Sequence, residues 1–241
     1  MPNAYVNKVV QSNGQTIIDI TDTTATAADV AQGKDFYLAT GEKATGTASG
    51  GGGDIDDYLD FTGGNIQAII GHGSEYIATD YADAAGIFGV KLKSNGITTW
   101  EHYFSFSNGN SRTGIQRYNA LAAQFQWSFN GTAINITSQD FGNGDVVEFA
   151  FSNPRYDIVS VDHPLLIFAG YFNGSMESQR SKSTFYGLNI VNHYGEYVAR
   201  FMPWIDNGTV GVKNLISGDF YSNAGTGAFD YIDLQGVLHS G

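Results

Sequence analysis

Apolar and polar positions alternate along most of the chain after residue 57, as is typical of β-strands with one buried face. The clearest runs are 125–129 and 146–151, where every second residue is a large apolar one. A period of two residues predicts strands, because successive side chains of a strand point to opposite faces. Further strands are predicted over 86–93, 100–106, 112–119, 132–137, 165–172, 184–191 and 197–201.

Turn residues separate these runs. Asparagine is followed by glycine at seven positions: Asn13, Asn95, Asn108, Asn130, Asn143, Asn173 and Asn207. This dipeptide accepts the positive φ angles of tight hairpin turns. Short strands joined by such turns predict an all-β fold, namely an antiparallel β-sandwich of two packed sheets.

A glycine-rich stretch divides the chain. Residues 49–53 read SGGGG, which has almost no side chain to pack and is typical of a flexible linker. We expect a small β-rich N-terminal module at 1–49, a linker at 50–56 and the sandwich domain at 57–241. The first part is too small to bury a good core alone, so we expect it to share surface with copies of itself or with a partner.

Composition excludes several classes of protein. The chain has 12 Lys and Arg against 24 Asp and Glu, and its net charge of −12 opposes binding to nucleic acid. No apolar run approaches the roughly 20 residues of a membrane span, so no membrane insertion is expected. The first ten residues lack the basic start and apolar centre of a signal peptide. The chain has no Cys, which excludes disulfides and thiolate metal sites.

No arrangement of residues predicts an enzyme. The five histidines are scattered, without the spacing that would aim two of them at one metal ion. Motifs of serine hydrolases, phosphate loops and zinc proteases are missing. The densest acidic cluster, Asp54, Asp56 and Asp57, lies beside the linker, where a solvated acidic patch is a simpler interpretation than a catalytic pair. We therefore predict no catalytic residues and no cofactor.

One turn offers oxygen ligands. Asp140, Asn143 and Asp145 could point several oxygens at a hard cation such as calcium. Asn and Asp also form turns by bonding to their own backbone. Both interpretations stay open, and because turn formation is the preferred one, no metal site is predicted.

A candidate ligand-binding face follows from the alternation in 100–106. If Trp100, Phe104 and Phe106 face the core, Glu101 and Tyr103 must point the other way. With the polar face of the next predicted strand, the candidate ligand-binding residues are Glu101, Tyr103, Arg112, Gln116 and Tyr118. A Tyr ring suits the C–H face of a sugar, and guanidinium and amide groups suit its hydroxyls. The alternative is an ordinary solvated sheet face, and the loops 108–114 and 173–182 are further candidates.

Residues 6–47 contain the segments VNKVV, TIIDITDTTATAADVAQGK and ATGEKATGT. Together these resemble a short module found near the start of many tailed-bacteriophage structural proteins, although Ala44 stands where that module usually has a larger apolar residue. The resemblance implies attachment to a virion and self-association. With it we expect a homo-oligomer, and a trimer is the expected state.

Four segments of the second region carry another resemblance: EYIATD at 75–80, TFYGLNIV at 184–191, VARFMPWID at 198–206 and VGVKNLISGDFYSNAGTGAF at 210–229. They resemble the concanavalin A-like, laminin-G-type jelly-roll domains of phage and bacterial surface proteins. Trp204 departs from the Cys often found in relatives, and Lys213 and Asn214 depart from a common Tyr-Asp pair. The family is common among carbohydrate-binding modules. Its glucanase branch has a Glu-x-Asp-x-Glu motif that this chain lacks, which implies binding without hydrolysis.

These observations predict a non-enzymatic virion surface protein of a tailed phage, either a tail receptor-binding protein or a head fibre or decoration protein. It would be assembled in the host cytoplasm and exposed on the particle. Its partners would be copies of itself, other virion proteins and a host-surface or environmental glycan. The alternative is a purely structural virion spacer without glycan binding, and a glycan hydrolase is third.

Overall fold

A computed structural model gives the fold of the chain. It describes residues 8–12, 15–19, 21, 24–27, 30, 35–45, 58–83, 86–95, 101–108, 111–117, 126–129, 132–135, 144–152, 163–172, 175–176, 180–192 and 195–241, and in some strands it describes the backbone alone. The chain divides into two compact units, Met1–Asp54 with His193–Glu196 and Ile55–Asn192 with Tyr197–Gly241. The linker predicted at 50–56 lies outside the described residues, so the domain limits given above stay a prediction.

The first unit contains two short antiparallel hairpins, β1 with β2 and β3 with β4. The strands are β1 (Lys8–Val10), β2 (Thr16–Asp19), β3 (Asp35–Tyr37) and β4 (Lys43–Thr45). An ion pair crosses each hairpin, because Lys8 Nζ lies 2.6 Å from Asp19 Oδ2 and Lys43 Nζ lies 2.6 Å from Asp35 Oδ2. Hydrogen bonds from Lys8 and from Thr21 lower the pKa of Asp19 to about 2.

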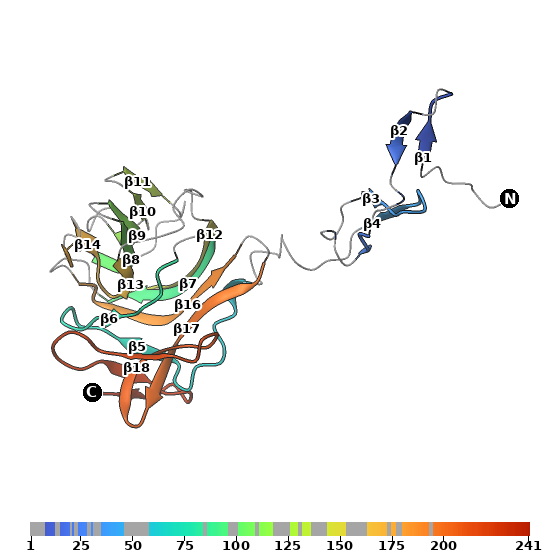
Figure 1. The fold of residues 1–241 in the computed structure, drawn as a ribbon. Coiled ribbons are helices and arrows are strands. Elements are labelled where there is room, and N and C mark those ends of the chain that lie inside the picture. The colour runs from blue at the N-terminus through green and yellow to red at the C-terminus, as the bar shows by residue number, and fades with distance from the viewer. Residues whose placement is uncertain are drawn as a thin grey trace. The chain divides into compact units, whose positions relative to one another are not determined.

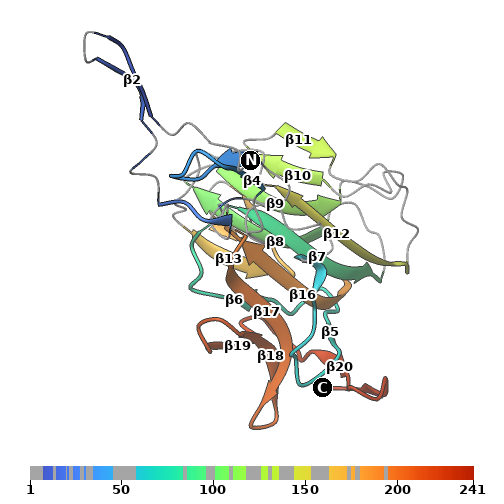
Figure 2. The same ribbon diagram turned by 90° about the vertical axis from the view of Figure 1, so that its right-hand side faces the viewer.

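The second unit is an antiparallel β-sandwich, which confirms the all-β prediction (Figures 1 and 2). One sheet has six strands in the order β11-β10-β9-β8-β13-β6. These strands are β6 (Ile77–Ala78), β8 (Glu101–Asn108), β9 (Ser111–Arg117), β10 (Gln126–Phe129), β11 (Thr132–Asn135) and β13 (His163–Ile167).

The other sheet has nine strands. Seven follow the order β19-β18-β17-β16-β5-β20-β21, while β7 pairs with β16 and β12 pairs with β7. These strands are β5 (Ala68–Ile70), β7 (Ile87–Ser94), β12 (Val146–Ser152), β16 (Ser183–Val191), β17 (Tyr197–Asp206), β18 (Thr209–Asn214), β19 (Phe220–Ser222), β20 (Asp230–Ile232) and β21 (Leu238–His239). A separate small hairpin joins β14 (Tyr171–Phe172) to β15 (Ser175–Met176).

Aromatic rings fill the space between the two sheets. The ring centroid of Phe88, on β7, lies 6.0 Å from that of Phe104 and 6.2 Å from that of Phe106, both on β8. All three side chains are buried. Burial of this apolar surface holds the sheets face to face. It also confirms that Phe104 and Phe106 face the core.

Strand β16 is a branch point of the nine-stranded sheet. Along one edge it pairs with β7 from Ser183 to Val191. Along its other edge, residues 188–191 pair with β17, whereas Thr184 and Phe185 pair with β5. The register against β7 shifts between Phe185 and Gly187, so an extra residue bulges out of the strand near the point where the second edge changes partner.

The run predicted as one strand over 165–172 is two strands. Strand β13 ends at Ile167 and β14 begins at Tyr171, because Phe168 has a φ of 67° that turns the chain out of the sheet. At the tip of the β17–β18 hairpin, Asn207 and Gly208 have φ angles of 48° and 81°. Positive φ at both central residues is what an Asn-Gly hairpin turn requires, so this predicted turn is confirmed.

Candidate functional site

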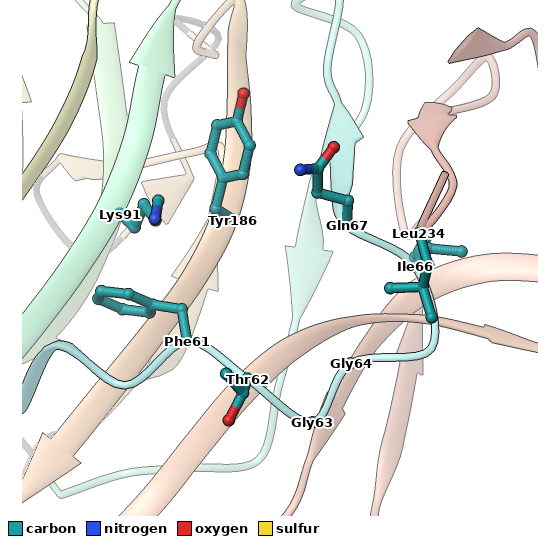
Figure 3. A pocket seen from close by; sticks show the side chains of 9 residues that line it. All are labelled: Phe61, Thr62, Gly63, Gly64, Ile66, Gln67, Lys91, Tyr186 and Leu234. Carbon is teal, nitrogen blue, oxygen red and sulfur yellow. The ribbon is translucent and has the colours of Figure 1, made fainter. Parts of the chain in front are cut away.

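A pocket of about 340 Å³ opens on the outer face of the nine-stranded sheet (Figure 3). Lys91 marks this face, because it alternates along β7 with Val90 and Leu92, which are buried in the core. The lining residues are Phe61, Thr62, Gly63, Gly64, Ile66, Gln67, Lys91, Tyr186 and Leu234.

The branch in the sheet creates this pocket. Lys91 and Tyr186 come from the paired strands β7 and β16, and Tyr186 is the extra residue of the bulge. Residues 61–67 lead into β5 and supply the largest share of the lining (Figure 3). Leu234 comes from the turn between β20 and β21. The pocket therefore lies beside the bulge of β16, near the point where the edge of that strand changes partner from β17 to β5.

Glycines let the 61–67 segment lie close to the sheet. A Cβ on Gly187 would come within 2.7 Å of Phe61 Cδ1, and a Cβ on Gly64 would come within 2.8 Å of the Pro203 carbonyl oxygen. Real Cβ atoms do not approach other heavy atoms so closely, so larger residues would push the segment away. Gly63 also has a φ of 99°, which side chains rarely adopt.

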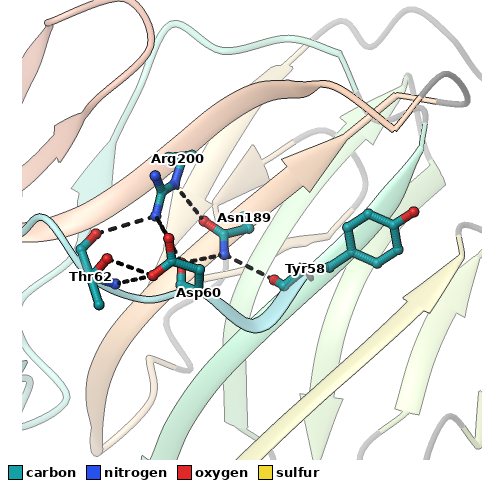
Figure 4. Close-up of polar contacts among 5 residues, drawn as sticks. All are labelled: Tyr58, Asp60, Thr62, Asn189 and Arg200. Atoms are coloured by element: carbon teal, nitrogen blue, oxygen red, sulfur yellow. Dashed lines mark hydrogen bonds and ion pairs between the residues drawn. The ribbon is translucent and has the colours of Figure 1, made fainter. Parts of the chain in front are cut away.

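A network of buried and half-buried polar groups fixes the segment that precedes the pocket (Figure 4). The side chain of Asn189 on β16, with none of its surface exposed, donates to the carbonyl oxygens of Tyr58 at 2.9 Å and Asp60 at 2.8 Å. Arg200 on β17 donates from Nη2 to the Asp60 carbonyl at 2.9 Å, to Asp60 Oδ2 at 3.0 Å and to the Thr62 carbonyl at 3.3 Å. These bonds join an irregular segment to two strands, so it has a defined position.

Asp60 is held ionised within this network. The Thr62 hydroxyl donates to Asp60 Oδ1 at 2.6 Å, and the Thr62 amide donates to the same oxygen at 2.9 Å. The hydrogen bond from the Thr62 hydroxyl is the main cause of a lowered pKa at Asp60, and Arg200 adds to it. The carboxylate therefore accepts hydrogen bonds in the wall of the site and does not line the pocket itself.

The charged and polar side chains of the lining differ in charge and in the hydrogen bonds they can make. Lys91 Nζ lies 2.9 Å from Glu148 Oε2 and 5.8 Å from the centroid of the Phe61 ring. Its charge is thus already paired. Burial raises the pKa of Tyr186, so its phenol stays protonated at neutral pH and can donate a hydrogen bond. Gln67 is exposed and adds an amide, which can both donate and accept.

This combination is suited to binding a small polar ligand that has apolar faces. Two aromatic side chains, one of which carries a phenol, converge on one hollow with an amide and two aliphatic side chains. Small-molecule sites combine apolar lining with a few polar groups in this way, and their volumes run from about 300 to 1,000 Å³. None of the nine lining residues is Asp or Glu, so the lining offers no carboxylate pair for cleaving a glycosidic bond.

The structure places the predicted site differently. Strands β8 and β9 are neighbours, as that prediction requires. Tyr103, however, is only 3% exposed and belongs to the core, so its predicted outward orientation is wrong. The cause is a bulge: His102 pairs with Gln116 and Phe104 pairs with Ile115, which leaves Tyr103 as an extra residue and breaks the alternation.

The face of β8 opposite the core is also covered. Ser105 is buried and its hydroxyl donates to the Ala169 carbonyl at 3.3 Å. A Cβ on Gly170 would meet the ring of His102 at 2.4 Å, so the segment after β13 lies directly against β8. An open polar face on this part of β8 is therefore not formed.

The other members of the predicted site are placed by backbone alone or not at all. Glu101 pairs with Arg117, Gln116 pairs with His102, and Arg112 pairs with Ser107. The structure describes only the backbone of Glu101, Gln116 and Arg112. Tyr118 lies wholly outside the described residues, as do residues 173–174 and 177–179 of the loop 173–182. The pairing does not bring Arg112 or Gln116 opposite Tyr103, and a binding role for these residues stays a prediction.

A buried carboxylate elsewhere has a structural role. Glu75 is 2% exposed, and its Oε2 accepts from the His72 amide at 2.7 Å and from the Ser74 amide at 3.3 Å, while the Ser74 hydroxyl donates to Oε1. Burial raises the pKa of Glu75, but the hydrogen bonds together outweigh it and hold the pKa below its ordinary value. Glu75 thus satisfies the backbone of its own loop.

Trp204 and Lys213, which both differ from residues common in the jelly-roll family that the sequence resembles, contact each other. Lys213 Nζ on β18 lies 4.5 Å from the centroid of the Trp204 ring on β17. A cation held over a Trp face is attracted by the ring, so the two departures stabilise each other. Neither residue lines the pocket.

In the described part of the chain, no group of three or more His, Asp or Glu is arranged to hold a metal ion. Asp145 is exposed there, whereas Asp140 and Asn143 of the possible calcium turn lie outside the described residues. The described residues form no helix that is long and apolar enough to cross a membrane.

The sequence contains one signal that could have located the pocket. Gly63 and Gly64 form a pair shortly after Phe61, and Gly187 lies within the run 184–191 predicted as a strand. A glycine within a strand often marks a bulge or a close approach of another segment, and both occur here. That these two glycine positions meet in space could not be inferred from the sequence.

Comparisons of this chain with protein-family models, with curated proteins and with solved structures find no match.

Proposed function

We propose that this chain is a non-enzymatic surface protein of a tailed-phage virion, and that its β-sandwich binds a glycan from the host surface or the environment. The pocket at the branch of β16 is the observation that carries the binding role. Phe61 and Tyr186 offer ring faces for the apolar side of a sugar, and Gln67 with the Tyr186 phenol offers hydrogen bonds to its hydroxyls. The volume suits about one sugar ring.

The virion part of the proposal is supported by the two residue resemblances, at 6–47 and at the four sandwich segments. Weak single sites suit a particle that carries many copies, because several sites acting together raise the effective concentration and so the avidity. The virion component with which the protein copurifies would tell whether it is a tail receptor-binding protein or a head decoration protein.

Glycan-array binding tests the proposal directly. We expect the full chain to bind a subset of glycans, and Phe61→Ala and Tyr186→Ala each to weaken that binding about tenfold through loss of a stacking face. Tyr37→Ala, an exposed aromatic of the first unit, is the matched control and should bind like the parent.

Two outcomes would replace the proposal. Binding to no glycan by a folded parent protein would favour the purely structural virion spacer. Release of reducing ends from cell-wall or capsular polysaccharide above a heat-inactivated control would favour a hydrolase.

The oligomeric state is tested separately. We expect light scattering on the full chain to give a trimer, and a truncated chain starting at Asp54 to lose that state. A monomeric full chain, or a truncated chain with an unchanged state, would contradict a role of the N-terminal module in assembly.

A further inference from the structure

We propose that the pocket selects an N-acetylated hexosamine over a plain hexose, an amino sugar or a carboxylated sugar. This inference rests on the proposed glycan-binding function and adds the chemical class of the ligand. It depends on three properties of the lining: an amide without a hydrogen-bond partner among the described residues, apolar side chains in the same lining, and a cation that is already neutralised.

Gln67 supplies the amide. Its backbone is fixed, since its amide nitrogen donates to the Ile232 carbonyl at 2.8 Å. Its exposed side chain makes no hydrogen bond to another described residue and is directed toward the side of the pocket where Tyr186 stands (Figure 3). An acetamido group presents one N–H and one C=O, which a carboxamide can match with its own acceptor and donor.

Ile66 and Leu234 supply the apolar side chains. Ile66 precedes Gln67 in the chain, is almost fully buried and also lines the pocket. Leu234 is 61% exposed and lines the same pocket from the turn between β20 and β21. A hydroxyl placed against these side chains would lose water without gaining a bond, whereas the methyl of an acetyl group would be removed from water.

The charges favour a neutral ligand. A carboxylated sugar would have to compete with Glu148 for Lys91, at a separation of 2.9 Å, and would approach a chain with a net charge of −12. An amino sugar would bring an ammonium group for which the lining has no free carboxylate, because none of the nine lining residues is Asp or Glu. N-acetylation removes the amine charge, and the protonated Tyr186 phenol remains a donor for a neutral hydroxyl or carbonyl.

The experiment is a titration of the full chain by ligand-observed NMR and calorimetry. The probes are the methyl glycosides of N-acetylglucosamine, N-acetylgalactosamine, glucose and glucosamine, together with glucuronate. One added hydrogen bond and one buried methyl predict that at least one N-acetylated sugar binds about tenfold or more tightly than glucose.

Variants assign that preference to the lining. Gln67→Leu should bring the affinity for the N-acetylated sugar to within about twofold of that for glucose, and Leu234→Ser should reduce the preference by a smaller factor. Gln235→Leu is the matched control, because Gln235 is an exposed glutamine outside the lining, and it should keep the full preference. All three variants should keep the unfolding midpoint of the parent.

The outcomes separate this inference from the proposed function. Equal affinity for glucose and both N-acetylated sugars, or a Gln67→Leu variant that keeps the preference, overturns the inference and leaves glycan binding standing. Binding of glucuronate or glucosamine more tightly than both N-acetylated sugars overturns the inference as well. Binding of no sugar by the parent protein overturns both.

Discussion

Strands β8 and β16 belong to different sheets, and each contains a β-bulge. The side chains of the two extra residues lie in different surroundings. Each has a bulge whose extra residue is a tyrosine, Tyr103 in β8 and Tyr186 in β16. Tyr103 is buried in the core, whereas Tyr186 is half-buried on the outer face and lines the pocket. The same residue type in the same local geometry therefore has a packing role in one sheet and a candidate binding role in the other.

The neighbouring residues explain the difference. Beside Tyr186, Gly187 has no side chain and leaves room on the outer face for Phe61. Beside Tyr103, the outer face is occupied by the segment 168–170, which contacts His102 and Ser105. A bulge removes the constraint of alternation, and the space left by the surrounding chain then decides where the extra side chain goes.

The largest effect that tests this comparison is on stability. Tyr103→Ala should lower the free energy of unfolding by about 3–5 kcal/mol, because it leaves a cavity in the core. Tyr186→Ala should cost about 1 kcal/mol or less, because that side chain is only half-buried. Urea unfolding of both variants measures the difference, and equal losses would contradict the two roles.

The next effect concerns the polar network that positions the pocket wall. Asn189→Ala should lower the free energy of unfolding by about 2 kcal/mol, since it removes the two hydrogen bonds that the Asn189 amide donates. The carbonyl of the buried Tyr58 loses this donor, whereas the Asp60 carbonyl keeps its bond from Arg200. Asn65→Ala is the matched control, because Asn65 also makes two bonds to backbone, at Ile205, but is exposed. Its loss should be about 1 kcal/mol or less in the same urea measurement, and the reverse order would contradict the role of the network.

A smaller effect appears as pH dependence. The folded pKa of Glu75 lies below its ordinary value of 4.5, so its contribution to stability is present above about pH 4.5 and is lost as the pH falls through the lower folded value. Glu75→Gln should cost about 1–2 kcal/mol at pH 7, because an amide cannot accept from every donor of the loop. Unfolding from pH 7 to 3 should also show a shallower acid slope, and a slope equal to that of the parent would contradict this assignment.

The smallest expected effect on stability comes from a variant that changes the charge next to the pocket and leaves the shape of the pocket almost unchanged. Glu148→Gln should change the free energy of unfolding by less than about 0.5 kcal/mol, because a partly exposed ion pair contributes little. It frees Lys91, so a sugar with both an acetamido and a carboxylate group, such as N-acetylmuramate, should bind about fivefold more tightly than to the parent. Calorimetry measures the gain, and unchanged affinity would show that Lys91 does not reach the ligand.

The sequence predicted the sandwich because alternation and Asn-Gly turns are local signals. Phe104 and Phe106 are buried as their spacing indicates, and Asn207 forms the expected turn. The candidate site depends instead on where the chain departs from regular pairing. Neither the bulge at Tyr103 nor the one at Tyr186 follows from a period of two, since a bulge is defined by the partner strand.

Contacts between residues far apart in the chain could not be predicted from the sequence either. The lining of the pocket comes from four places in the chain, the segment 61–67 and the single residues Lys91, Tyr186 and Leu234. No spacing rule relates these positions, because they come from the segment before β5, from β7, from β16 and from the turn between β20 and β21. Gly63, Gly64 and Gly187 indicated tight approaches, yet not which segments approach one another.

The position of β5 has a consequence for the order of folding. Ile70 pairs with both Thr184 and Asp230, so β5 closes two loops of more than a hundred residues each. Closing long loops is entropically costly and slow, whereas β16, β17 and β18 follow one another and can pair early. Because the pocket lies between these early and late parts of the sheet, it is completed last. During refolding, the onset of sugar binding should therefore lag behind the signal of strand formation and mark the final step.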